Sequence, residues 1–108
     1  LKLLILIDKL KNLKEFIVNM KVLDFYADWC GPCKTLAPII KQFCENNKLT
    51  LESINVEDND DLVQKYKIRN IPVIVFEDLD GKELKRLVGM QTQDNLTKVY
   101  KEIMGTDA

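Results

Sequence analysis

The sequence lacks histidine altogether, contains only three cysteines, and has no apolar run long enough to cross a bilayer. Its 16 basic and 17 acidic residues leave a formal net charge of −1. Without a basic excess the chain is poorly suited to nucleic acid or an anionic membrane, and we expect neither as a partner. Three cysteines cannot build the disulfide framework of a small secreted domain. One close pair with an odd residue instead fits a catalytic dithiol in a reducing compartment.

The length and composition fit one small globular domain that spans residues 1–108. Apolar residues make up 46% of the chain and charged residues 31%, which suits a soluble protein with a real core. The apolar start has some likeness to a signal peptide, but Lys2 interrupts it and no small-residue cleavage site follows. We interpret residues 3–7 as a first strand. A segment removed upstream is left open, because the chain starts at Leu1.

Apolar periodicity, caps and turn residues predict alternating strands and helices along the chain. Residues 21–27 are largely apolar, as in a central strand buried on both faces. Asn59 and Thr92 are candidate helix caps, and Asp80-Gly81 is a hairpin signal. Helical crossovers first and a hairpin last imply an α/β fold, with a central mixed β-sheet flanked by helices on both faces. The expected strands are 3–7, 21–27, 49–56, 72–77 and 83–88, and the expected helices are 8–18, 33–47, 60–66 and 93–104.

The most informative motif is Cys30-Gly31-Pro32-Cys33. Two cysteines separated by two residues can close a small disulfide ring, which predicts reversible dithiol–disulfide exchange. A fixed structural disulfide and half of a zinc site are the alternatives. Zinc normally takes four ligands, and the chain has no histidine to supply them. In a continuous helix the third cysteine, Cys44, lies about 16 Å beyond Cys33, so we expect no metal site.

A helix that starts at this motif gives the two cysteines different roles. Unpaired backbone N–H groups of its first turn point toward Cys30, and the helix dipole favours a negative charge there. Pro32 fits the first turn because its missing N–H is not needed, and Gly31 keeps a Cβ away from an incoming substrate. We therefore expect Cys30 to be the exposed nucleophile with the lower pKa. Cys33 should be more buried and should resolve the mixed disulfide.

Asp24 and Cys44 are the remaining candidates for a chemical role. Asp24 lies inside an expected strand, where a buried charge costs several kcal/mol unless it is neutralised. Burial would raise its pKa and keep the neutral acid near neutral pH, whereas an exposed aspartate at the strand edge is the alternative. Cys44 follows Phe43 near the apolar stripe of a helix. We interpret it as a packing residue, with a regulatory thiol as the alternative.

The segment 24–34 closely resembles the active site of the thioredoxin family, because an aspartate and a tryptophan precede the dithiol as they do there. The order of the elements and the spacing of Pro72 extend the resemblance over about residues 22–104. It implies the thioredoxin fold. It also implies that Asp24 acts as a proton shuttle for Cys33.

The same resemblance implies a substrate-binding surface. The Ile71–Pro72 peptide bond should be cis and face the dithiol, which frees the backbone before the proline to pair with substrate. Gly89 matches the glycine beside the active-site groove of the family, with an ordinary turn glycine as the alternative. A flat apolar surface around Cys30 would suit varied partners. Its expected members are Trp29, Gly31, Pro32, Ile71, Pro72, Gly89 and Met90.

Three positions depart from the family pattern. Ser53 stands where the family commonly has a lysine near the aspartate, with Glu52 beside it. A cation that lowers the pKa of Asp24 is therefore missing, and we expect Asp24 to stay protonated to higher pH than in relatives with lysine. Val73 replaces the usual threonine after the proline. Tyr26 stands where many relatives have a second tryptophan, and we expect it to pack behind the dithiol.

We interpret the chain as a protein-disulfide reductase of the thioredoxin type that needs no bound cofactor. The resemblance implies electrons from thioredoxin reductase, an NADPH-dependent flavoprotein, and disulfide-containing target proteins as substrates. Oxidases and isomerases of the family tend to carry histidine between the cysteines, and glutaredoxins carry Pro-Tyr, so Gly-Pro favours the reducing role. A binding module in which the dithiol is dispensable is the alternative from another class. We expect a cytoplasmic monomer, since a docking surface must stay free.

Overall fold

The computed structural model describes Leu3 and residues 20–105. The helix expected over 8–18 lies outside the described residues, as does the strand expected over 3–7 apart from Leu3. At Leu3 the strand prediction is wrong, because its backbone is helical. Leu3 is 70% exposed and has no strand partner among the described residues, so no ladder holds it extended.

Four strands form one mixed sheet in the described part of the chain, in the order β2-β1-β3-β4. β1 (Lys21–Tyr26) lies parallel to β2 (Thr50–Asn55) and antiparallel to β3 (Val73–Glu77), and β3 lies antiparallel to β4 (Glu83–Val88). The mixed sheet expected from the sequence is therefore confirmed. β1, β2 and β3 are each one or two residues shorter than expected, because pairing stops before the apolar pattern does.

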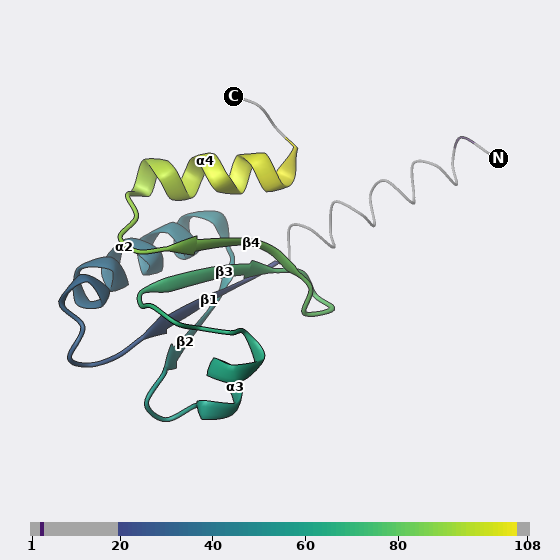
Figure 1. Cartoon of the computed structure of the whole chain (residues 1–108). Helices are drawn as coiled ribbons and strands as arrows, with labels where there is room; N and C mark the ends of the chain where they lie inside the picture. Colours follow the sequence, from purple (N-terminus) through teal and green to yellow (C-terminus); the bar gives the residue numbers. More distant parts are fainter. Residues whose placement is uncertain (1–2, 4–19, 106–108) are drawn as a thin grey trace.

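Within residues 20–105, three helices cover the two faces of this sheet (Figure 1). α2 (Gly31–Asn47) and α4 (Gln93–Met104) lie on one face, and α3 (Asp60–Lys65) lies on the other. α2 contains Pro38, which removes one hydrogen bond from the helix interior. No helix in the described part of the chain combines the length and apolar character that a membrane span requires.

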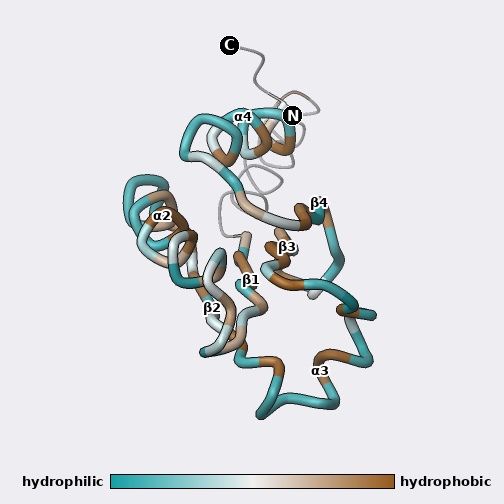
Figure 2. Tube along the Cα trace, turned by 60° about the vertical axis from the view of Figure 1, so that its left-hand side comes forward, coloured by the Kyte–Doolittle hydropathy of each residue, from teal (hydrophilic) through white to brown (hydrophobic). Residues whose placement is uncertain are grey.

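Alternation along the central strands sends side chains into two separate cores. On the α2 and α4 side, Val22, Ile74 and Phe76 pack with buried residues of both helices. On the α3 side, Leu23 and Val75 belong to a smaller cluster with residues of and around α3. Figure 2 shows the apolar residues concentrated on the central strands and the polar ones on the outer turns. Each central strand is therefore buried on both faces, as expected of β1.

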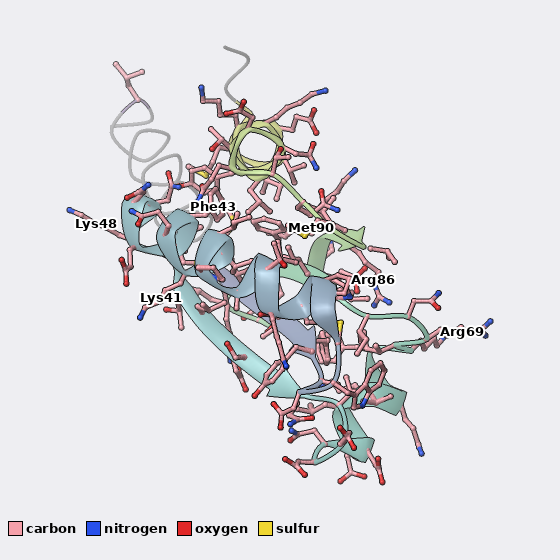
Figure 3. All side chains as sticks on the ribbon, turned by 90° about the vertical axis from the view of Figure 1, so that its left-hand side faces the viewer. Lys41, Phe43, Lys48, Arg69, Arg86 and Met90 are labelled. Atoms are coloured by element: carbon pink, nitrogen blue, oxygen red, sulfur yellow. A yellow bond between two sulfur atoms is a disulfide. The ribbon has the colours of Figure 1, made fainter. Side chains whose placement is uncertain are left out.

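Aromatic rings join the larger core to both helices on its face. The Phe43 ring of α2 meets the Phe76 ring edge-on, with 6.1 Å between centroids, and the Tyr100 ring of α4 at 5.8 Å. Figure 3 shows Phe43 between α2 and α4, with Lys41 and Lys48 on the outer side of α2. This packing holds α2 against the sheet and so determines where its first turn, with the dithiol, is placed.

The ends of the helices follow local capping chemistry, with two differences from expectation. α2 begins at Gly31 and not at Cys33, because Cys30 serves as its N-cap. Asn59 sits at the N-cap position of α3, but its side-chain amide donates to the Asn55 carbonyl oxygen at 2.9 Å and makes no cap. The expected cap of α4 is confirmed, since the Thr92 hydroxyl accepts from the Asn95 N–H at 3.1 Å.

Candidate active site

The two cysteines of the motif form a disulfide at the N-terminus of α2, with 5.3 Å between their Cα atoms. Cys30 Sγ accepts a hydrogen bond from the Cys33 backbone N–H at 3.2 Å. The helix therefore directs one of its unpaired N–H donors at the sulfur of Cys30, as the sequence predicts. The expectation that Cys30 is exposed is wrong for this disulfide form, since Cys30 is only 5% exposed and Cys33 3%. Both cysteines pack against Ala27.

A small apolar cluster supports the disulfide from behind. Cys30 and Cys33 pack with Ala27, and Tyr26 and Ile71 lie against this cluster. The position expected for Tyr26 is thus confirmed. The cluster joins the turn between β1 and α2 to the segment before β3, so parts of the chain about 40 residues apart hold the dithiol in place.

A hollow of about 250 Å³, here called the Asp24 hollow, opens on the Cys33 side of the disulfide. Its volume suffices for several water molecules, each of which takes about 30 Å³ in the liquid. Asp24 and Cys33 both line it, so the aspartate and the more buried cysteine share one cavity. The full lining consists of Asp24, Tyr26, Ala27, Asp28, Cys33, Lys34, Ala37 and Ser53.

Asp24 is a buried acid, and the alternative of an exposed aspartate at the strand edge is wrong. Its side chain is 4% exposed, and it has no hydrogen bond or ion pair with any described residue. Burial raises the pKa of Asp24 from its ordinary value of 3.8 to about 6. Ser53 is its partner in the β1–β2 register, so the uncharged residue lies directly beside the aspartate, as the sequence comparison with the family predicts. Ser53 is exposed and forms part of the lining.

The segment before β3 lies on the other side of the dithiol. The Ile71–Pro72 peptide bond is cis, as predicted, and Pro72 is fully buried. The Pro72 carbonyl oxygen accepts from the Gly89 N–H at 2.8 Å, which ties the end of β4 to this segment. Gly89 adopts φ +90°, a conformation that favours glycine, so its place in the sequence has a backbone reason.

The other members of the expected substrate surface are exposed. The Trp29 side chain is 69% exposed and Met90 46%, and Gly31 and Pro32 are exposed as well. Trp29 and Ile71 line a second hollow, of about 210 Å³, which we call the Arg69 hollow. Its lining consists of Trp29, Val56, Val63, Ile68, Arg69 and Ile71. Exposed aromatic and apolar side chains therefore lie next to the disulfide in sequence, and one of them lines this hollow.

Cys44 is a packing residue of the larger core. It is 3% exposed and packs among apolar side chains of α2, α4 and the sheet. Burial and the nearby Asp24 carboxylate raise the pKa of the Cys44 thiol to about 12, so its reactive thiolate is scarce at neutral pH. The part of the chain that the structure describes holds no cluster of cysteines and carboxylates suited to a metal ion.

The sequence reasoning missed several residues that line the two hollows. Asp28 and Ala37 lie around the Asp24 hollow, and Val63, Ile68 and Arg69 lie around the other. Arg69 is close to Pro72 in sequence, which is the one signal that could have drawn attention to it. The apolar residues read as ordinary core positions, because nothing local distinguishes the wall of a hollow from the interior.

Comparison with known proteins gives a consistent result. The sequence model of the family described as Thioredoxin matches residues 5–102. A thioredoxin from Chlamydia caviae is 33% identical over 94 residues, covering 85% of this chain and 91% of that protein. A thioredoxin from Staphylococcus epidermidis is 36% identical over 84 residues, covering 75% and 79%. The solved structure of a mutant thioredoxin from Halobacterium salinarum superimposes with a TM-score of 0.75 at 30% identity, covering 89% of this chain and 86% of that one.

Proposed function

Since this chain belongs to the thioredoxin family and is a thiol–disulfide oxidoreductase, we propose that Cys30 is its nucleophile and Cys33 its resolving thiol. The observation that carries the proposal is the hydrogen bond from the Cys33 N–H to Cys30 Sγ at the helix N-terminus. In the reduced protein the same donor and the helix dipole stabilise negative charge on Cys30. No comparable donor is directed at Cys33 among the described residues.

The reaction transfers two electrons to the target disulfide. The Cys30 thiolate attacks one target sulfur, forms a mixed disulfide and displaces the other target sulfur as a thiolate. Cys33 then loses its proton and attacks Cys30 Sγ, which closes the intramolecular disulfide and releases the second target thiolate. Protons from Cys33 and from solvent complete the two target thiols.

Asp24 is proposed as the proton acceptor for Cys33. The support is that both residues line one hollow and that burial places the pKa of Asp24 at about 6, within reach of neutral pH. A carboxylate in a water-accessible hollow can take the thiol proton and return it to solvent. Ser53 leaves the charge on this carboxylate uncompensated by any neighbouring cation from β2.

Target proteins are proposed to dock on the surface around Cys30. The exposed Trp29 and Met90 provide apolar contact area, and Ile71 lies against the disulfide cluster with its backbone next to the place a target would occupy. This surface comprises Trp29, Gly31, Pro32, Ile71, Pro72, Gly89 and Met90.

The remaining assignments follow from membership of the family. We propose that a thioredoxin reductase, an NADPH-dependent flavoprotein, supplies the electrons, and that no cofactor is bound. A dithiol that must be regenerated in the reduced form fits the cytoplasm. We propose a monomer of one domain, residues 1–108, because oligomer formation through the docking surface would block it.

The proposed roles are tested by the reduction of insulin disulfides with dithiothreitol as electron donor. The native chain should turn over rapidly, and Cys30→Ser should abolish turnover because it removes the proposed nucleophile and leaves only buried thiols, with Cys33 3% exposed. Cys44→Ser is the matched control, since it removes a cysteine outside the site and should retain activity. Absence of turnover from well-folded native protein would overturn the reductase proposal and favour the binding-module alternative.

A further inference from the structure

The Arg69 hollow lies close to the Cys30 sulfur, so it is near the residues that flank the attacked cysteine of a target protein. Trp29 directly precedes Cys30, and Ile71 packs against the disulfide cluster, so two of its lining residues border the reacting sulfur. An extended chain advances about 3.3 Å per residue. The first two or three residues beside a target cysteine are therefore within reach of the hollow.

The residues that line this hollow are apolar, with the exception of Arg69. Trp29 and four aliphatic residues line it, and Arg69 provides the single charged group. Arg69 is exposed, and it makes no hydrogen bond or ion pair with any described residue. Figure 3 shows its side chain extending outward, beyond the end of α2 opposite Lys48. A guanidinium in this position is available to a carboxylate, which it can bind through two N–H donors.

Acidic residues near the hollow add to the preference of Arg69 for a target carboxylate at its own end of the hollow. The chain between the lining residues Val56 and Val63 carries four carboxylates, at Glu57, Asp58, Asp60 and Asp61. A target carboxylate would be repelled by this acidic segment and attracted by Arg69. The hollow therefore distinguishes the two directions in which a charged target chain could cross it.

We infer that the Arg69 hollow selects target disulfides in which the attacked cysteine is followed or preceded, on one side only, by an apolar residue and then an acidic one. The apolar side chain enters the hollow, and the acidic side chain pairs with Arg69. This inference rests on the proposed function, since it concerns the choice among disulfides that Cys30 attacks.

The test uses peptides with one cysteine, each joined by a disulfide to thionitrobenzoate. The reduced full-length protein attacks the peptide sulfur through Cys30, and thionitrobenzoate leaves because it is the more acidic thiol, so its absorbance reports the rate. The two residues beside the cysteine are Leu-Glu, Leu-Lys or Ser-Glu, counted outward from it. One set of peptides carries them before the cysteine and a second set carries them after it.

In one of the two sets, the Leu-Glu peptide should react about fivefold faster than the Leu-Lys peptide, the size expected of an exposed ion pair. It should also react about fivefold faster than the Ser-Glu peptide, because the hollow then stays unfilled. Salt at about 0.5 M should reduce the rate ratio of the Leu-Glu to the Leu-Lys peptide, because salt screens the ion pair. It should leave the rate ratio of the Leu-Glu to the Ser-Glu peptide unchanged. Equal rates for all three peptides in both sets would overturn the inference.

The charge reversal Arg69→Glu should make the Leu-Lys peptide the faster one of that set. Lys41→Glu makes the same change in net charge on the outer side of α2, away from the hollow, and should leave the native ranking intact. An unchanged ranking in Arg69→Glu, or an equal loss of rate on all peptides, would also overturn the inference. Failure of the native protein on every peptide and on insulin would instead contradict the proposed function.

Discussion

The Asp24 hollow and the Arg69 hollow both border the dithiol, but their charged residues lie in opposite surroundings. Asp24 is 4% exposed, and burial raises its pKa to about 6, so its protonation can change near neutral pH. Arg69 is exposed and keeps its positive charge. Burial brings the pKa of a carboxyl group near neutral pH and so suits Asp24 to proton transfer, whereas an exposed guanidinium, which keeps its charge in proteins, is suited to recognition. Four predictions test this division.

The largest expected effect separates the two chemical steps. In Cys33→Ser the first attack, on the side of the docking surface, should proceed, but resolution should fail. Turnover should fall by at least about 1000-fold, as for other residues that form covalent bonds during a reaction. Mass spectrometry should find the target trapped on Cys30, whereas Cys44→Ser should trap nothing. Full turnover without a trapped species would show that Cys33 is not the resolving thiol.

Asp24→Asn should stabilise the folded protein at neutral pH. The native pKa of about 6 lies above the ordinary 3.8, so the folded state holds its proton more tightly and native stability falls as pH rises through this window. The variant lacks this loss. The difference in free energy of unfolding between the variant and the native protein should grow from near zero below pH 4 to about 3 kcal/mol at pH 7 and above. Urea denaturation of both proteins across pH 3–8 measures the difference, and a gap independent of pH would contradict burial of an ionisable Asp24 as its cause.

The same substitution should slow the chemistry on the Cys33 side only. Resolution should fall by about 100-fold, the lower end of what positioned acid–base groups contribute, and it should lose its rise with pH through about 6. The rate of first attack by Cys30 should stay near the native value. Rapid-mixing measurements of mixed-disulfide formation and decay separate the two steps. Equal slowing of both would mean that Asp24 acts on the dithiol as a whole.

The smallest expected effect concerns Ser53. A lysine there would place a cation beside the aspartate and lower the pKa of Asp24 by about one unit or more. Ser53→Met is the matched control, because it fills similar space without charge. Carbon NMR of the Asp24 carboxyl group follows the titration in all three proteins. If the Lys and Met variants titrate alike, filling of the hollow, and not charge, controls the pKa.

Several features that local interactions control were predicted correctly from the sequence. The Thr92 cap and the Asp80-Gly81 hairpin were both predicted and are both present. The hairpin also depends on Asp78, whose carboxylate accepts from the Asp80 and Lys82 N–H groups at 2.9 Å each, and this was not foreseen. Asn59 has the right residue type for a cap, but its side chain bonds to Asn55 instead. Residue type indicates which bonds a side chain can make, whereas the geometry of the loop selects among them.

The sequence by itself determined the dithiol, its position at a helix N-terminus and the burial of Asp24, because spacing, capping and apolar pattern act over a few residues. Only the tertiary structure decided that Asp24 and Cys33 share a hollow and that Arg69 lines another hollow with Trp29 and Ile71. Cys30 is also buried in the disulfide form, whereas the sequence predicted that it is exposed. These features depend on strand register and on the packing of α2 and the segment before β3, which bring together residues far apart in the chain.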